Sequence, residues 1–166
     1  AMPAEAGGGV LLFCSDAIYL VPRPRDVRQS PPSTSALHRV DLDRPVYVVS
    51  ATCLPMRHDR VRVVFGTEDG RVSLLHVVRR ASWEQVDLDV KHLGMAPVAT
   101  APQGLSFLAE DYVFLASNTG DSLVWHVQDG VKEVHRWPSL APIIDFVKDD
   151  ASFADRIITA SGAGST

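Results

Sequence analysis

The sequence predicts an all-β fold, a β-propeller of WD40-like blades, from three observations. An apolar segment that fits a hairpin occurs twice, as VVFGTEDGRVSLLHV from Val63 and as VFLASNTGDSLVWHV from Val113, 50 residues later. A polar strand and a proline-led strand accompany each copy in a fixed order. No segment shows the helical period, whereas Val86, Leu88 and Val90 alternate as a half-exposed strand requires. Short strands that recur at this spacing are typical of propeller blades.

The start of the chain divides into three expected parts. Residues 1–9, AMPAEAGGG, are interpreted as a cloning scar with a flexible start, and the partial propeller is predicted over residues 10–166. Residues 10–21 fit a short hairpin that turns at Ser15 and Asp16. A Pro/Arg-rich loop is predicted at 22–36, which holds four of the eleven prolines.

Each repeating unit is then predicted to run from a polar strand, through a proline-led apolar strand, to the hairpin. The polar strands are expected in LHRVDLD from Leu37, EQVDLDVKHL from Glu84 and VKEVHRW from Val131. The proline-led strands are expected in RPVYVV from Arg44, APVATA from Ala96 and APIIDF from Ala141, since proline is tolerated at a strand start.

The hairpin tips carry EDG and NTGD, and tight turns of this kind need the positive φ that Gly70 and Gly120 supply. A third copy, IITASGAGST, starts at Ile157, and the sequence stops inside its turn at Thr166. The prediction is a partial propeller of about three to four blades, part of a larger propeller. Its open edges are expected to pair with a second chain that completes the ring, or with a copy of itself.

Composition indicates a soluble globular protein, with 46% hydrophobic and 22% charged residues among 166. No apolar run approaches the roughly 20 residues of a membrane span, so no membrane partner is expected. A net charge of −4 gives no overall electrostatic reason to bind nucleic acid, which stays open only as a weakly supported alternative. Cys14 and Cys53 lie in apolar runs, which predicts two buried free thiols and a reducing compartment.

The sequence offers no catalytic motif, so no catalytic, cofactor-binding or metal-binding residue is predicted, and the chain is not expected to be an enzyme. His76 and His126 occupy equivalent repeat positions and are interpreted as structural, with a metal pair as the alternative. Asp69 and Asp121 are interpreted as turn residues, although a propeller glycosidase would use two carboxylates facing one cleft. The glycine-rich tail SGAGST is read as a blade turn, with a phosphate loop as the alternative.

Residues outside the repeat are the candidates for partner binding. Trp83 and Trp137 fall in or near the polar outer strands, where a large aromatic is less needed for the core and can anchor an interface. Arg23, Arg25 and Arg28 lie in the predicted loop, which is interpreted either as solvated chain or as a contact with a protein or a phosphate backbone.

Six pieces in this order resemble the closing blades of the amino-terminal propeller in one scaffold family. They are GGGVLLFCSDAIYLV, VDLDRPVYVVSAT, VVFGTEDGRVSLLHV, VDLDVKHLGMAPVA, YVFLASNTGDSLVWHV and APIIDFVKDDASFADRIITASGAGST. The family comprises the large subunit of the damaged-DNA-binding complex, the methyl-methanesulfonate-sensitivity scaffolds, the large subunit of the cleavage and polyadenylation specificity factor, and the propeller scaffold of the branch-site splicing factor.

The resemblance implies a non-catalytic scaffold in a nuclear multiprotein complex. It favours the adaptor of a cullin-RING ubiquitin ligase in DNA repair or chromatin, because the GDS turn and IITASGAG look closest to that branch. A scaffold of pre-mRNA splicing or 3′-end processing is the alternative, since RPVYVVSAT and APVATA look closer to the splicing scaffold. The expected partners are protein subunits, and the expected location is the nucleus.

Overall fold

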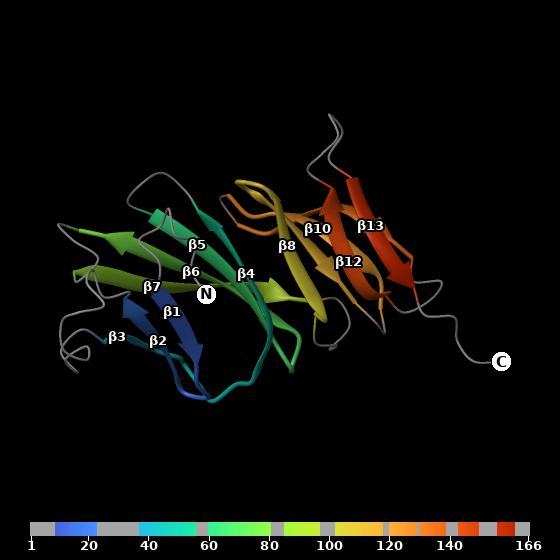
Figure 1. The fold of residues 1–166 in the computed structure, drawn as a ribbon. Helices are drawn as coiled ribbons and strands as arrows, with labels where there is room; N and C mark the ends of the chain where they lie inside the picture. The colour runs from blue at the N-terminus through green and yellow to red at the C-terminus, as the bar shows by residue number, and fades with distance from the viewer. Residues whose placement is uncertain are drawn as a thin grey trace.

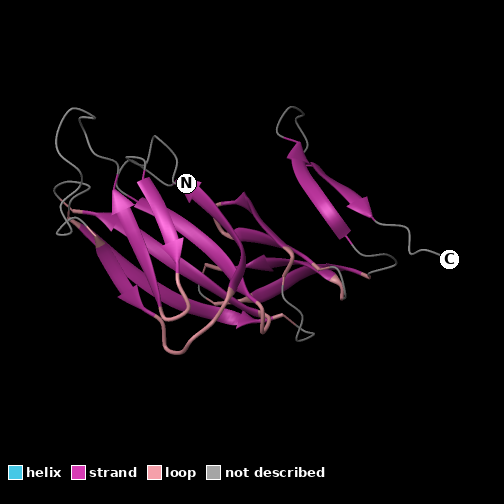
Figure 2. Ribbon diagram, turned by 60° about the horizontal axis from the view of Figure 1, so that its bottom comes forward, coloured by secondary structure: helices cyan, strands magenta, loops and turns pink. Residues whose placement is uncertain are grey.

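The computed structural model describes residues 9–22, 37–55, 60–80, 85–96, 102–117, 120–128, 130–138, 143–149 and 156–161. These ranges form thirteen β-strands (Figure 1), and every regular element drawn in Figure 2 is a strand. Within them, no helix is long and apolar enough to cross a bilayer. The predicted all-β class is confirmed.

The strands form four antiparallel sheets, each of which follows the order of the chain and is named here as a blade. Blade 1 holds β1 (Gly9–Phe13), β2 (Ala17–Pro22) and β3 (His38–Asp41). Blade 2 holds β4 (Val48–Pro55), β5 (Arg60–Thr67), β6 (Arg71–Arg79) and β7 (Val86–Met95). Blade 3 holds β8 (Gly104–Ala109), β9 (Tyr112–Ala116), β10 (Ser122–His126) and β11 (Lys132–Trp137). Blade 4 holds β12 (Ile143–Asp149) and β13 (Arg156–Ser161).

The blades stack face to face along the chain. The first strands of successive blades lie together, with β8 between β4 and β12, and the last strands β3 and β7 also meet. The same succession can be followed from blue to red in Figure 1. This arrangement is that of a partial propeller, as the repeat predicted.

The repeated hairpin segment forms the two middle strands of each complete blade. In β5–β6, Val64 pairs with Leu74, and in β9–β10 the equivalent pair is Phe114 with Val124. Because side chains alternate between the faces of a strand, neighbouring residues of β5 serve two different interfaces. Phe65 packs toward blade 1, whereas Val64 packs toward blade 3. The repeated segment is apolar almost throughout because the middle strands are buried on both faces.

Three clusters of apolar side chains fill the spaces between the blades. Blades 1 and 2 share Ile18, Leu20, Val61, Val63, Phe65, Leu75 and Val77. Blades 2 and 3 share Val64, Val72, Leu74, Leu105, Phe107, Val113, Leu115, Leu123, Trp125 and Val127. Phe114, Ala116 and Val124 of blade 3 pack against Phe146 and Ile157 of blade 4. Each core therefore belongs to a pair of blades rather than to one.

The polar strands are the outer strands of the blades, as expected. They are the last strands of the preceding blades, since β3, β7 and β11 pair with β2, β6 and β10. Their position explains their polarity, because a last strand has only one neighbour and a more solvated surface. In β11 all six residues are exposed.

The proline-led strands begin later than predicted. In RPVYVV, β4 starts only at Val48, because the Val46 N–H donates to the Ser15 carbonyl of blade 1 while the chain is still crossing between blades. Of APVATA, residues 97–101 lie outside the described residues, and the first strand of blade 3 is GLSFLA, which the sequence reasoning did not identify. In APIIDF, β12 starts at Ile143.

Two glycines allow the first strands to approach their neighbours. A Cβ on Gly66 of β5 would lie 2.3 Å from Cγ of Pro102, just before β8. A Cβ on Gly104 of β8 would lie 2.3 Å from Cε1 of Phe146 on β12. Both distances are shorter than any real carbon–carbon contact, so the close spacing of blades 2 to 4 depends on glycine at these positions.

A buried arginine joins blade 2 to blade 3. The Arg62 side chain on β5 is only 10% exposed, and its Nη1 lies 2.9 Å from Oδ1 of Asp111 in the β8–β9 turn. The same nitrogen donates to the Glu110 carbonyl, and the guanidinium lies 5.8 Å from the centroid of the Phe107 ring. Since a buried charge needs a partner, this contact couples the two blades.

The positive φ predicted for the glycines at the hairpin tips is confirmed at Gly70 in the β5–β6 turn, and Gly120 is not among the described glycines with positive φ. Gly70 has a φ of 85°, and its N–H donates to the Thr67 carbonyl at 3.0 Å. We expect Gly70→Val to lower the free energy of unfolding by about 1–3 kcal/mol, because β-branched residues strongly disfavour this conformation. Urea denaturation followed by circular dichroism measures the change.

Gly70→Asn is the control, because asparagine adopts positive φ far more readily than valine does. Gly70→Asn should lower the free energy of unfolding by less than Gly70→Val does. Equal losses in the two variants would show that the space around the turn, and not its backbone conformation, requires glycine.

The prediction that both cysteines are buried was wrong for Cys14, which is exposed. Cys14 follows β1 and begins the turn toward β2, so its place in an apolar run did not translate into burial. Cys53 on β4 is half-buried, and burial raises the pKa of its thiol. The two cysteines are not joined in a disulfide, as predicted.

Candidate protein-interaction surface

Trp137 lies at the end of β11 and is 44% exposed. Its ring stands edge-on to the buried Phe114, with centroids 6.0 Å apart, and its centroid lies 4.1 Å from that of His135. A large aromatic ring that is fixed on one edge and exposed on the rest is a common anchor in protein interfaces.

The register explains why this ring stands out from the blade. Trp137 pairs with Ser122, and the repeat makes Ser122 the equivalent of Val72, whose partner on β7 is Gly94. At Gly94 the space is used by the next blade, because Cη2 of Trp125 lies 3.8 Å from the position of a Cβ there. Trp137 of blade 3 therefore stands at the position that Gly94 occupies in blade 2, where Trp125 of the next blade fills the space.

The other candidate contact residues lie outside the described residues. Trp83 falls in the range 81–84, and Arg23, Arg25 and Arg28 fall in the range 23–36, between β2 and β3. Their roles remain predictions.

The arginine of β11 forms ion pairs with acidic neighbours. Arg136 lies 2.7 Å from Glu133 on the same strand and 3.2 Å from Asp121 beside the β9–β10 turn. The hydrogen bond from Arg136 lowers the pKa of Glu133, and the two carboxylates raise the pKa of Arg136. This ion pairing offsets the positive charge near Trp137 and favours a protein partner over a phosphate backbone.

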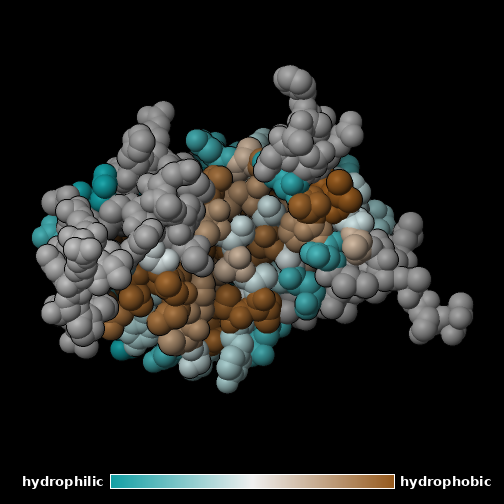
Figure 3. Space-filling model, in the orientation of Figure 1, coloured by the Kyte–Doolittle hydropathy of each residue, from teal (hydrophilic) through white to brown (hydrophobic). Residues whose placement is uncertain are grey.

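Blade 1 has an apolar face turned away from blade 2. Val10 and Leu12 of β1 are exposed, while Leu11 and Phe13 between them pack toward blade 2. Leu12 pairs across the sheet with Tyr19, whose ring lies 5.6 Å from the guanidinium carbon of Arg39. The space-filling view shows apolar side chains gathered over this end of the molecule (Figure 3).

Blade 4 has a second open apolar face, turned away from blade 3. Val147 of β12 and Ile158 of β13 form a cross-strand pair, and each is 58% exposed. Phe146 and Ile157, their neighbours in the chain, point the other way into the core shared with blade 3. An incomplete propeller is expected to leave two open sheet faces, but the sequence did not identify their residues, because an apolar alternation does not reveal whether a blade has neighbours on one side or on two.

The two histidines of the repeat occupy different surroundings. His76 is half-buried between its cross-strand neighbours Arg62 and Asp89, and burial followed by the charge of Arg62 lowers its pKa. The ring of His126 packs against Tyr112, with centroids 4.9 Å apart. Over the described ranges, no group of three or more His, Cys, Asp or Glu side chains could hold a metal ion.

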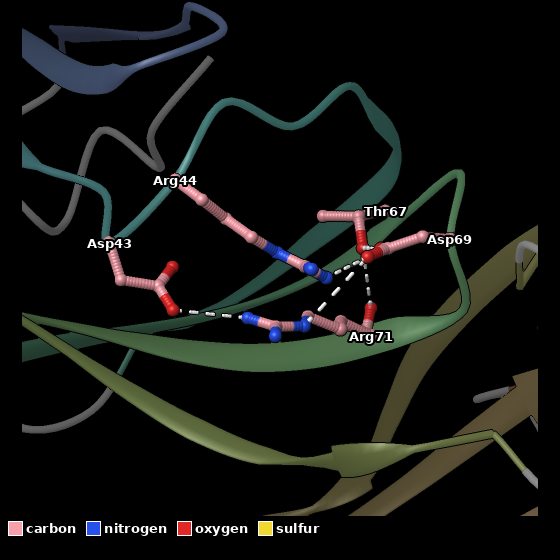
Figure 4. Close-up of polar contacts among 5 residues, drawn as sticks. All are labelled: Asp43, Arg44, Thr67, Asp69 and Arg71. Atoms are coloured by element: carbon pink, nitrogen blue, oxygen red, sulfur yellow. Dashed lines mark hydrogen bonds and ion pairs between the residues drawn. The ribbon is translucent and has the colours of Figure 1, made fainter.

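The turn aspartates are held by neighbouring side chains. Asp69 accepts a 2.5 Å hydrogen bond from the Thr67 hydroxyl and forms an ion pair with Arg44, and both interactions lower its pKa (Figure 4). Nε of Arg71 lies 3.8 Å from Asp69 as well. These contacts tie the β5–β6 turn to the chain that crosses from blade 1 to blade 2, which is a structural role.

A recess of about 380 Å³ lies beside this turn, between blades 1 and 2. Leu42 and Val46, from the β3–β4 connection, form one apolar wall, and Phe65 and Val90 of blade 2 form the other. Its polar lining consists of Asp41, Asp43, Thr67, Arg71, Ser73 and His92. Sequence reasoning did not identify it, since its residues come from distant parts of the chain.

A comparison with protein-family models finds a match over residues 2–141 to the first β-propeller of RSE1, DDB1 and CPSF1. No curated protein matches the chain in a sequence search. The matched region includes the described strands of blades 1 to 3, and the succession of antiparallel sheets, two of them four-stranded, agrees with a propeller domain. This is a family of propeller scaffolds and not of enzymes. The chain belongs to the RSE1/DDB1/CPSF1 first β-propeller family.

Proposed function

We propose that the chain acts in the nucleus as an adaptor of a cullin-RING ubiquitin ligase in DNA repair or on chromatin. The family match carries this proposal, because it identifies a non-catalytic propeller scaffold that works through protein contacts in multi-subunit complexes. The exposed Trp137 and the two open apolar faces support it, since a scaffold needs surface on which partners can dock.

A scaffold of pre-mRNA splicing or 3′-end processing is the second candidate. The matched family names RSE1 and CPSF1 beside DDB1, and RPVYVVSAT and APVATA look closer to the splicing branch. A propeller enzyme has less support, because Asp69 and Asp121 each form an ion pair with an arginine instead of facing a shared cleft.

The open faces of blades 1 and 4 are proposed to pack against a second chain that completes the propeller, or against a second copy of this one. Val10 and Leu12 at one end and Val147 and Ile158 at the other are exposed apolar side chains. Light scattering of the purified chain over a range of concentrations tests self-pairing. We expect a mass above that of the monomer at high concentration, which Ile158→Glu should reduce, and a monomer at every concentration would contradict self-pairing.

Affinity capture of the full chain from nuclear extract, followed by mass spectrometry, tests the proposed role. We expect a cullin and its substrate receptors among the captured proteins. Splicing or polyadenylation subunits in their place would favour the second candidate. A chain that captures neither group while remaining folded would contradict both.

A further inference from the structure

The recess between blades 1 and 2 exists because β3 is short. β3 ends at Asp41, and the chain then crosses to β4 instead of continuing along β7. The face of blade 2 extends past this point through Phe65, Ser73 and His92, which lie in one row across β5, β6 and β7. One wall of the recess is therefore built on regular strands, and the other comes from the β3–β4 connection.

The lip of the recess is fixed by the contacts around Asp69. Arg71 donates from Nη1 to Oδ2 of Asp43 at 3.1 Å, and its Nε lies 3.8 Å from Asp69 (Figure 4). Asp69 is in turn held by Thr67 and Arg44. The two aspartates and the two arginines balance in charge, so a ligand with a net charge would gain little from this lip.

Several polar groups at the recess have no partner among the described residues. Ser73 is 8% exposed, yet its hydroxyl makes no hydrogen bond to a described residue. Nη2 of Arg71 and Oδ1 of Asp43 likewise have none there. The Ser73 hydroxyl is not one of the buried side-chain atoms that lack a partner, so it is open to the recess, where a ligand can reach it.

The unused groups match the chemistry of a peptide. Arg71 supplies a donor, Asp43 an acceptor and Ser73 a hydroxyl that can act as either, and a peptide unit carries one N–H and one C=O. Leu42, Val46 and Val90 offer an apolar wall for a side chain. A neutral amide with an aliphatic side chain satisfies both parts of the lining.

We propose that this recess binds an extended segment of a protein partner through one aliphatic side chain and its adjoining peptide groups. The inference rests on the scaffold function and gives it a specific contact. Leu42, Val46 and Val90 receive the side chain, while Ser73, Arg71 and Asp43 hold the main chain. Such a pocket would fix the register of the segment, as pockets for side chains do in other peptide-binding grooves.

Nuclear magnetic resonance of the full chain tests the inference with N-acetyl-leucine N′-methylamide as the probe. We expect saturable shifts of the Ser73, Val90 and His92 amides. The glycine analogue should bind about tenfold more weakly, because it lacks the side chain that the apolar wall would bury. The glutamate analogue should also bind more weakly, because its charge would enter a recess with no free counter-charge.

Two substitutions locate the probe. Ser73→Ala should weaken binding about three- to tenfold through the lost hydrogen bond, and Arg71→Met should weaken it by a similar factor. Arg136→Met, which removes an arginine beside the hairpin turn of the next blade, should leave probe binding unchanged and serves as the control.

The absence of saturable shifts in the wild-type chain would overturn the inference, and so would equal binding by Ser73→Ala. This measurement needs no partner protein. A chain that captures partners but does not bind the probe would therefore lose the recess inference and keep the scaffold function.

Discussion

Trp125→Ala is expected to lower the free energy of unfolding by about 3–5 kcal/mol, because it removes a large ring from a close-packed core. Trp125 is 3% exposed and lies at the centre of the core that blades 2 and 3 share. Its ring belongs to the same cluster as Val72 and Leu74 of blade 2, and its Cη2 lies 3.8 Å from the position of a Cβ on Gly94. Removing it leaves a cavity between two sheets that cannot easily move together.

Urea denaturation followed by far-ultraviolet circular dichroism measures this loss without relying on tryptophan fluorescence. Trp137→Ala is the matched control, because that ring is 44% exposed and should cost about 1 kcal/mol or less. Trp125→Phe provides a milder variant if the alanine variant does not fold. A loss below about 1 kcal/mol for Trp125→Ala would contradict the stacked arrangement of blades 2 and 3.

Asp111→Ala is expected to cost about 3 kcal/mol, because it leaves the buried guanidinium of Arg62 without its counter-charge. The carboxylate accepts from Nη1 of Arg62 at 2.9 Å, and the carbonyl of Glu110 cannot replace its charge. The contact joins β5 to the β8–β9 turn, so its loss should weaken the interface between two blades rather than either blade alone.

A double-mutant cycle with Arg62→Met separates the charge effect from packing. Methionine keeps an apolar stem in the place of the arginine, so the double variant should be more stable than Asp111→Ala alone. Thermal and urea unfolding of the four proteins give the coupling free energy. Additive losses would show that Arg62 and Asp111 do not depend on each other.

The repeat allowed much of the fold to be predicted. Aligning Gly70 with Gly120 placed the hairpins β5–β6 and β9–β10 correctly, because a hairpin is a local structure with a strong turn signal. The short hairpin at Ser15 and Asp16 was also correct. The assignment of strands to blades was harder to predict, because the path of the chain decides whether β3 pairs with the strand before it or after it.

Contacts between blades could not be predicted from the sequence. Gly66 and Gly104 read as breaks within apolar runs, although each accommodates a side chain of the next blade. Nothing in the local pattern showed that Arg62, one of sixteen basic residues, would be the one buried against Asp111.

The candidate surface was predicted only in part. Trp137 was identified as a non-repeated aromatic and is exposed as expected. Open faces were expected of an incomplete propeller, but Val147 and Ile158 were not identified as part of one, because they look like ordinary core residues until the register places them on the side away from blade 3. The recess depends on where β3 ends, and strand ends are set by tertiary hydrogen bonds that a single sequence does not display.

The central claim is that the repeated positions build blades while the exposed surface binds partners. Co-precipitation beside thermal melting of the same variants tests it most directly. We predict that Trp137→Ala reduces partner capture at an unchanged melting temperature, whereas His76→Gln and His126→Gln keep capture wherever they keep stability. A repeated-position variant that melts like the wild type yet abolishes a chemical turnover, with Trp137→Ala harmless, would contradict the scaffold account.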